Sequence, residues 1–212
     1  MHVHSFRSVD GLITPKEIKN AISSGTIDAV AVTDHNTTAA WRDFKGLPVI
    51  RSVEKSIIED NGNQFHLLIY FMNEDIAGDD FASVMDAVRE QDAFASIAHP
   101  FDKVRNAPTN LDAYAGDVDA LECFNARMCT PNGNKKAQEY ARSHGLRMTA
   151  GSDAHHCSEI GAAYVEADAA DIEEFRKLLL KGRVRIAGSI SLPHVHTFSL
   201  LRRRGIIHPN SE

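Results

Sequence analysis

The order of apolar and polar segments is the feature that most constrains this chain. Short runs rich in β-branched and aromatic residues alternate with polar stretches of helical character. Such alternation is typical of a largely parallel β-sheet with helices packed outside it. We therefore predict an α/β fold whose strands lie at residues 27–33, 47–54, 65–71, 93–98, 120–124, 146–150 and 184–187.

Turn and capping signals refine this pattern. The Asn61-Gly62 pair between the second and third predicted strands indicates an antiparallel hairpin. Thr14, Pro15 and Glu17 resemble an N-cap, a first-turn proline and a capping-box glutamate, which predicts a helix ending near Ser24. Further helices are predicted at residues 80–91, 134–143 and 171–181, and residues 201–212, with arginines at 202–204, are expected to be partly frayed.

Length and composition exclude several classes of protein. A chain of 212 residues that is 43% hydrophobic can bury one substantial core, so we expect a single domain over residues 1–212. The net charge of −6 argues against a protein that coats nucleic acid. Three cysteines without a CxxC pair indicate neither a disulfide framework nor a thiolate zinc site. The sequence has no membrane-length apolar run and no leader pattern, so we expect a cytoplasmic protein without membrane contact.

Side chains that can bind metals occur where predicted strands begin or end. His2 and His4 are two residues apart, so in an extended segment both imidazoles lie on one face. In a parallel barrel the carboxyl ends of the strands share one rim, so distant residues can converge there. The other candidates at such positions are Asp10, His35, Glu54, His66, His99, Asp153 and His155.

Each motif taken alone has a simpler explanation. Asp10-Gly11 is compatible with an ordinary turn, and His99-Pro100 with the end of a strand. His144 is expected to be solvated at a helix end, and the segment from His194 to His196 in a solvated loop. Six independent segments that place His, Asp or Glu at strand ends are not explained by chance. The joint pattern therefore predicts a metal site.

The types of ligand indicate the metals. Imidazole nitrogens and carboxylate oxygens suit zinc, manganese and iron, and the absence of clustered thiolates argues against a closed structural zinc site. A carboxylate such as that of Glu54 can bridge two ions. Two neighbouring ions lower the pKa of a shared water and stabilise charge on a transferring phosphoryl group.

These motifs resemble those of the PHP family, which is named for its polymerase and histidinol-phosphatase members. The resemblance spans residues 2–155 and rests on four motifs. They are His2-Val3-His4 through Asp10-Gly11, Thr33-Asp34-His35, His99-Pro100, and Gly151-Ser152-Asp153-Ala154-His155, with Glu54 and His66 at two intervening ligand positions. The resemblance implies a distorted seven-stranded (β/α) barrel that holds two or three divalent ions.

The resemblance also implies how the ligands are shared. It assigns His2, His4, Glu54 and Asp153 to the first ion, Glu54, His66 and His99 to the second, and Asp10, His35 and His155 to the third. Glu54, Asp153 and His99 are then the expected catalytic residues. One departure is that His2 directly follows Met1, whereas family members carry several strand residues before this histidine, so we expect a shortened first strand or a start upstream.

The expected substrate is a small phosphorylated metabolite or nucleotide. Arg105 and Arg127 follow two of the strand ends, and a guanidinium matches phosphate oxygens, although both could equally be solvated loop charges. A nuclease that trims short DNA or RNA ends would use the same chemistry, so nucleic acid enters as a substrate only. A third alternative is a metal-binding domain without catalysis, which would not need all nine ligand positions filled. The oligomeric state is left open.

Overall fold

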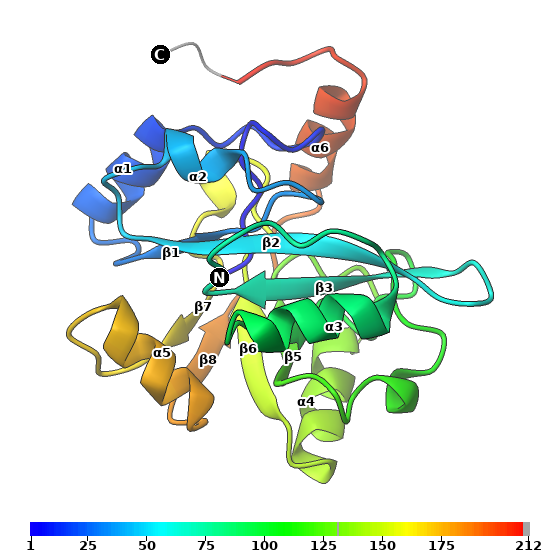
Figure 1. Ribbon diagram of the computed structural model, residues 1–212. Coiled ribbons are helices and arrows are strands. Elements are labelled where there is room, and N and C mark those ends of the chain that lie inside the picture. The colour runs from blue at the N-terminus through cyan, green and yellow to red at the C-terminus, as the bar shows by residue number, and fades with distance from the viewer. Residues whose placement is uncertain (131, 210–212) are drawn as a thin grey trace.

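The computed structural model describes residues 1–130 and 132–209. Six strands form one curled half-barrel sheet in the order β1-β2-β3-β4-β5-β6 (Figure 1). Neighbouring strands run parallel except for β3, which is antiparallel to both β2 and β4. The strands are β1 (Val30–Val32), β2 (Val49–Ile58), β3 (Gln64–Tyr70), β4 (Phe94–Ile97), β5 (Ala120–Asn125) and β6 (Arg147–Gly151). The predicted α/β class and the predicted hairpin are confirmed.

The helices lie outside the sheet, and the four predicted ones are confirmed. They are α1 (Pro15–Ser23), α3 (Phe81–Glu90), α4 (Gly133–Ser143) and α5 (Ile172–Leu180). The capping box is present, because the Glu17 carboxylate accepts a hydrogen bond from the Thr14 backbone N–H at 2.8 Å. Asp80 and Asp171 are the N-cap residues of α3 and α5, and the side chain of each accepts a hydrogen bond from a backbone N–H in the first turn. A short helix, α2 (Ala40–Asp43), was not predicted.

The alternation of side chains along β2 and β3 separates the core from the site. Phe65, Leu67 and Ile69 of β3 belong to a buried apolar cluster that also includes residues of α3. In a strand the intervening residues face the opposite side, which places His66 on the inner face of the sheet. The same alternation puts Val53 in that apolar cluster and turns Glu54 inward. The inner face can therefore carry polar ligands without disrupting the outer core.

The N-terminal segment, residues 2–5, runs between the two edges of the curled sheet. The backbone N–H of Thr33, just after β1, donates to the carbonyl of Val3 at 2.8 Å. On the other side, the N–H of His4 donates to the carbonyl of Ala154, after β6, also at 2.8 Å. These bonds fix the position of both N-terminal histidines relative to the rest of the sheet.

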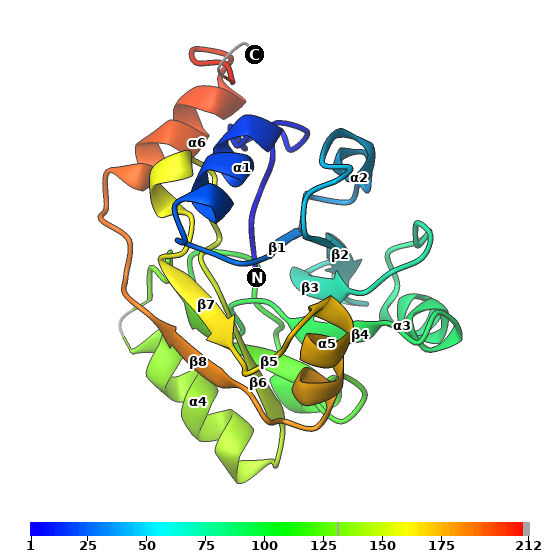
Figure 2. The ribbon, with the colours of Figure 1, turned by 90° about the vertical axis from the view of Figure 1, so that its left-hand side faces the viewer.

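The last predicted strand does not join the main sheet. Its counterpart, β8 (Arg185–Gly188), pairs antiparallel with β7 (Ala163–Glu166) in a separate two-stranded sheet beside β6 (Figure 2). β7 was not predicted.

The expectation of a solvated loop at residues 194–196 was wrong. This segment begins the helix α6 (Val195–Arg203), and His194 is its N-cap residue. Pro193 did not prevent this helix, because it precedes the first turn, where a missing N–H is tolerated. The final part of the tail expected to be frayed, residues 210–212, lies outside the described residues.

Within residues 1–130 and 132–209, none of the helices combines the length and the apolar character that crossing a membrane requires.

The close approach of β6 to the N-terminal segment gives a stability prediction. A methyl group added at Gly151 would overlap Cβ of His2 and lie 2.6 Å from Oε1 of Glu122, whereas one added at Gly116 would meet nothing within 4 Å. We expect Gly151→Ala to lower the free energy of unfolding by roughly 1–3 kcal/mol through overpacking. Gly116→Ala is the control and should change it by less than about 0.5 kcal/mol. Equal stabilities in urea unfolding would contradict the close packing.

Candidate metal centre

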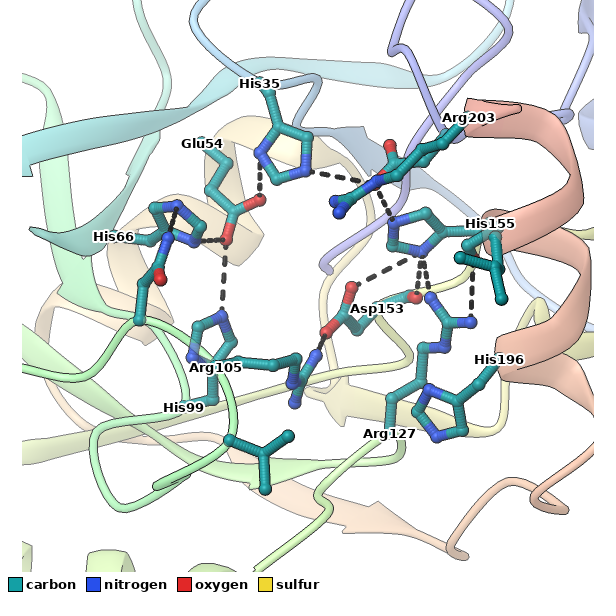
Figure 3. Close-up of a pocket in the computed structure, with 15 residues that line it drawn as sticks. His35, Glu54, His66, His99, Arg105, Arg127, Asp153, His155, His196 and Arg203 are labelled. Atoms are coloured by element: carbon teal, nitrogen blue, oxygen red, sulfur yellow. Dashed lines mark hydrogen bonds and ion pairs between the residues drawn. The ribbon is translucent and has the colours of Figure 1, made fainter. Parts of the chain in front are cut away.

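The nine predicted ligand residues converge on one cluster at the rim of the sheet. Figure 3 shows His35, Glu54, His66, His99, Asp153 and His155 of this cluster around the cavity. His2, His4 and Asp10 come from the N-terminal segment, and the other six come from a strand or from the segment that follows one. Seven of their side chains are nearly inaccessible to solvent, whereas those of His66 and His35 are 11% and 22% exposed. Strand ends far apart in the sequence therefore meet as the predicted topology requires.

Glu54 lies at the centre of this cluster. Its Oε1 is 2.9 Å from Nδ1 of His66 and 3.4 Å from Nε2 of His99. Its Oε2 is 3.2 Å from Nε2 of His4 and 2.9 Å from Nδ1 of His35. The two oxygens thus face different groups of imidazoles, which is the geometry that a bridging carboxylate requires.

The two N-terminal histidines face a second carboxylate. Nε2 of His2 and Nε2 of His4 are 3.1 Å apart, and Oδ1 of Asp153 is 3.7 Å and 3.5 Å from them, respectively. Oε2 of Glu54 is within 3.5 Å of both nitrogens. Two imidazoles and two carboxylates therefore surround one point, as the resemblance implies for the first ion.

Asp10 organises the other end of the cluster. Its Oδ2 is 3.4 Å from Nε2 of His155 and 3.6 Å from Nε2 of His35. The compact groups differ slightly from the implied sets, since His35 also joins Glu54 and His66, and His4 also joins Asp10 and His155. Adjacent positions in the cluster therefore share ligands.

Several buried polar atoms of the cluster lack a hydrogen-bond partner, as is expected of a cation-binding site. Among the described residues, Asp10 Oδ1, Glu54 Oε2, His66 Nδ1 and His99 Nδ1 are buried and have no hydrogen bond of acceptable geometry. Native structures leave few such atoms, because each costs the energy of desolvation. Carboxylate oxygens and imidazole nitrogens in this density match the donor set of a divalent transition metal.

Charge in the cluster is set by the close packing of acids and imidazoles. Burial raises the pKa of Glu54, but the neighbouring imidazoles outweigh it and hold that pKa well below its usual range. Burial lowers the pKa of His35, but the carboxylates of Glu54 and Asp10 outweigh it and raise the pKa to about 10. Burial, together with the charge of His4, lowers the pKa of His155 to about 4. His155 is therefore neutral near pH 7, the form that binds metals.

Two residues of the cluster have an unusual backbone conformation. His99 and Asp153 have positive φ angles of 29° and 53°. Residues other than glycine seldom adopt such angles, which cost on the order of 1–3 kcal/mol each. This strain lies where side chains must be aimed into the cluster, which is where functional sites tend to store it.

Glu122 of β5 belongs to the site and was not predicted. Its Oε1 accepts from Nδ1 of His2 at 2.9 Å, and its Oε2 accepts from the backbone N–H of His99, also at 2.9 Å. The Nδ1 contact leaves Nε2 of His2 directed at the cluster, as in carboxylate–histidine–metal arrangements. A lone glutamate inside an apolar buried strand was the available sequence signal.

The two predicted substrate arginines both line the cavity but differ in their surroundings. Arg105, whose side chain is 24% exposed, pairs with Asp153 and, at 3.0 Å, with Asp102. Arg127 is 4% exposed, and it contacts Nδ1 of His155 at 2.6 Å and Glu159 at 3.0 Å. Arg105 thus stands at the cavity surface, whereas Arg127 is buried against His155, a predicted ligand.

The helix α6 forms a cavity wall that sequence reasoning missed. The cavity has a volume of about 450 Å³, and its lining includes His196, Ser199, Leu200 and Arg203 of this helix. Positions spaced three and four apart share one helical face, so these residues point the same way. Arg203 lies 2.6 Å from Oδ2 of Asp10 (Figure 3). The spacing was visible in the sequence, but the helix was not expected.

Comparison with known proteins identifies the family. The model of the PHP-associated family matches residues 131–184. The uncharacterized protein MJ0417 of Methanocaldococcus jannaschii is 32% identical over 181 residues, which are 82% of this chain and 72% of the relative. This chain belongs to the PHP family.

Solved structures with low sequence identity share the fold. A two-domain protein from Bacteroides vulgatus, which contains a predicted PHP-like metal-dependent phosphoesterase, has a TM-score of 0.68 at 18% identity, covering 95% of this chain and 68% of its own. The lesion-specific endonuclease PfuEndoQ from Pyrococcus furiosus has a TM-score of 0.62 at 18% identity, covering 88% and 56%. The fold thus occurs in one protein described as containing a predicted metal-dependent phosphoesterase and in another described as a lesion-specific endonuclease.

The contact between Glu122 and His2 gives a prediction about metal binding. Removing the negative charge in Glu122→Gln should weaken metal affinity about 10–100-fold, the usual cost of losing a carboxylate behind a histidine ligand. The matched control is Glu139→Gln, since that glutamate is exposed on α4. Titration with zinc and manganese, with circular dichroism to verify folding, measures the effect. Equal affinities in the two variants would show that Glu122 does not position His2.

Proposed function

We propose that this protein hydrolyses phosphate esters in a metal-dependent reaction, with a small phosphorylated metabolite or nucleotide as substrate. The observation that carries the proposal is the composition of the cavity. Its lining combines the ligand cluster with three arginines, Arg105, Arg127 and Arg203. A site that gathers metal ligands and guanidinium groups around about 450 Å³ suits a compact anion.

The cluster would hold two or three divalent ions, with zinc, manganese or iron as the candidates. When bound, these ions would supply an activated hydroxide and stabilise charge on the phosphoryl oxygens. We assign the bridging position to Glu54, because its two oxygens face separate groups of imidazoles. His2, His4 and Asp153 would complete one position, His66 and His99 a second, and Asp10, His35 and His155 a third.

We also propose which residues act most directly on the reacting groups. Glu54, Asp153 and His99 are the candidate catalytic residues, because they would hold the ions at the cavity. Asp153 also pairs with Arg105, which links the ligand cluster to a phosphate-binding cation. Arg105 would bind the non-reacting part of the substrate, since its fork lies at the cavity surface. Arg127 would act on the substrate mainly through its positive charge, because its side chain is buried against His155.

The seven-stranded barrel that the resemblance implies is part of the same proposal, as is a single domain over residues 1–212. Six strands are paired in the curled sheet, and residues 2–5 would supply the seventh. Support comes from the bonds that Val3 and His4 make to the ends of β1 and β6. Closure of this kind would hold His2 and His4 between the two sheet edges.

The substrate class and the role of Arg105 are tested together. Arg105→Ala should lower kcat/KM on the preferred phosphorylated metabolite about 10–100-fold, the cost of losing charged hydrogen bonds to an anion. Arg142→Ala, on α4 outside the cavity lining, is the charge-matched control and should retain wild-type rates. Loss of activity in Glu54→Gln would assign the measured reaction to this site.

The same assay separates the proposal from a nuclease. At moderate salt we expect a small monoester to be hydrolysed faster than a single-stranded oligonucleotide, because weak oligonucleotide binding is exaggerated at low salt. Efficient degradation of oligonucleotides from one end, without monoester hydrolysis, would replace the proposal with the nuclease alternative.

A further inference from the structure

The helix α6 is held over the cavity chiefly by polar contacts and ring stacking. Its Val195 is buried, whereas Leu200 is 48% exposed. Arg127 donates to Oγ of Ser199 at 2.8 Å, and the ring of Phe198 stacks on His156 with centroids 4.3 Å apart. A helix with so few apolar residues in the core can move at a lower cost than one packed into it.

The last turn of α6 places the positively charged side chain of Arg203 against the buried ligand cluster. Arg203 donates through Nε and Nη2 to the same oxygen of Asp10, Oδ2, at 3.0 Å and 2.6 Å. The side chain of Asp10 is 1% exposed, while that of Arg203 is 57% exposed. An exposed guanidinium therefore reaches inward to neutralise a carboxylate that is itself sealed from water.

Oδ2 of Asp10, which accepts both hydrogen bonds from Arg203, also faces two imidazoles. His155 Nε2 and His35 Nε2 lie 3.4 Å and 3.6 Å from Oδ2 of Asp10. Oδ1 of Asp10 is buried and has no hydrogen-bond partner among the described residues. The Asp10 carboxylate thus offers ligand atoms to a cation. The Arg203 guanidinium contacts the oxygen on which the imidazole nitrogens of His35 and His155 converge.

We propose that Arg203 is a built-in competitor for the divalent ion at Asp10, His35 and His155. Its guanidinium neutralises Asp10 while the position lacks an ion, and it must withdraw when a divalent ion binds there. Two like charges so close repel each other. The imidazoles that would share the ion also face the oxygen that Arg203 contacts. The inference rests on the metal centre of the proposed function and does not depend on which ester, if any, is hydrolysed.

Competition of this kind couples the ion to the helix. Binding at the Asp10 position would release Arg203 and loosen the last turn of α6. By linkage, the factor by which the ion shifts α6 toward release is also the factor by which fixing α6 in place would lower the affinity for the ion. The released guanidinium would remain beside the cavity, where Arg105 and Arg127 also lie, and could then contact an anionic ligand.

The test compares metal binding in two matched variants. Arg203→Ala removes the competing cation, whereas Arg204→Ala removes the same charge from an exposed neighbour at the end of α6. Manganese is titrated into metal-free protein, and bound ions are counted by electron paramagnetic resonance and equilibrium dialysis. We expect the weakest-bound ion to bind about tenfold more tightly in Arg203→Ala, and as in wild type in Arg204→Ala.

Hydrogen exchange of α6 provides a readout that does not depend on affinity. In wild type, saturating manganese should speed amide exchange over Val195–Arg203. In Arg203→Ala, exchange there should already be fast without manganese and should change little. Two outcomes would overturn the competitor role while leaving the metal centre intact. One is identical manganese affinities in wild type and Arg203→Ala, and the other is an equal effect of manganese on the exchange rates of α6 in both proteins. Failure of every variant to bind manganese would overturn the metal centre as well.

Discussion

Three buried carboxylates, those of Asp10, Glu54 and Asp153, lie beneath one cavity and are each about 1–2% exposed. An ionised carboxylate removed from water costs several kcal/mol unless opposite charge lies close to it. Histidines surround all three, and Arg105 and Arg203 pair with two of them from the cavity side. The rest of the structure can be understood as the scaffold that keeps this concentration of negative charge buried and compensated.

Compensation in this protein uses side chains that come from distant parts of the chain. Glu54 depends on histidines from four separate segments, and Asp10 depends on Arg203, which is 193 positions away. Such long-range pairing also explains the close approach of β6 to the N-terminal segment, because His2 must pass Gly151 to reach the cluster. A bound divalent ion would take over much of this neutralisation, which is why the arginine contacts and the metal positions have to be considered together.

Local patterns predicted much of this arrangement. The ligands at strand ends and the capped helices follow from short-range rules, and the structure brings all nine ligand candidates together. Glu122 was missed because its importance depends on His2, which is 120 positions away. The helix α6 was missed because Pro193 and the polar C-terminal residues around it favoured a loop, and because its position over the cavity is set by contacts of Arg127 and Arg203. Long-range contacts of this kind leave no periodic trace in the sequence.

The histidines and carboxylates are proposed to form a metal centre. Elemental analysis of the purified protein, after expression in medium supplemented with zinc, manganese and iron, tests this most directly. The buried carboxylates and the unpartnered ligand atoms predict two or three transition-metal ions per chain. Fewer than one ion per chain in folded protein would contradict the account, because the cluster would then be neutralised by its own histidines and arginines alone.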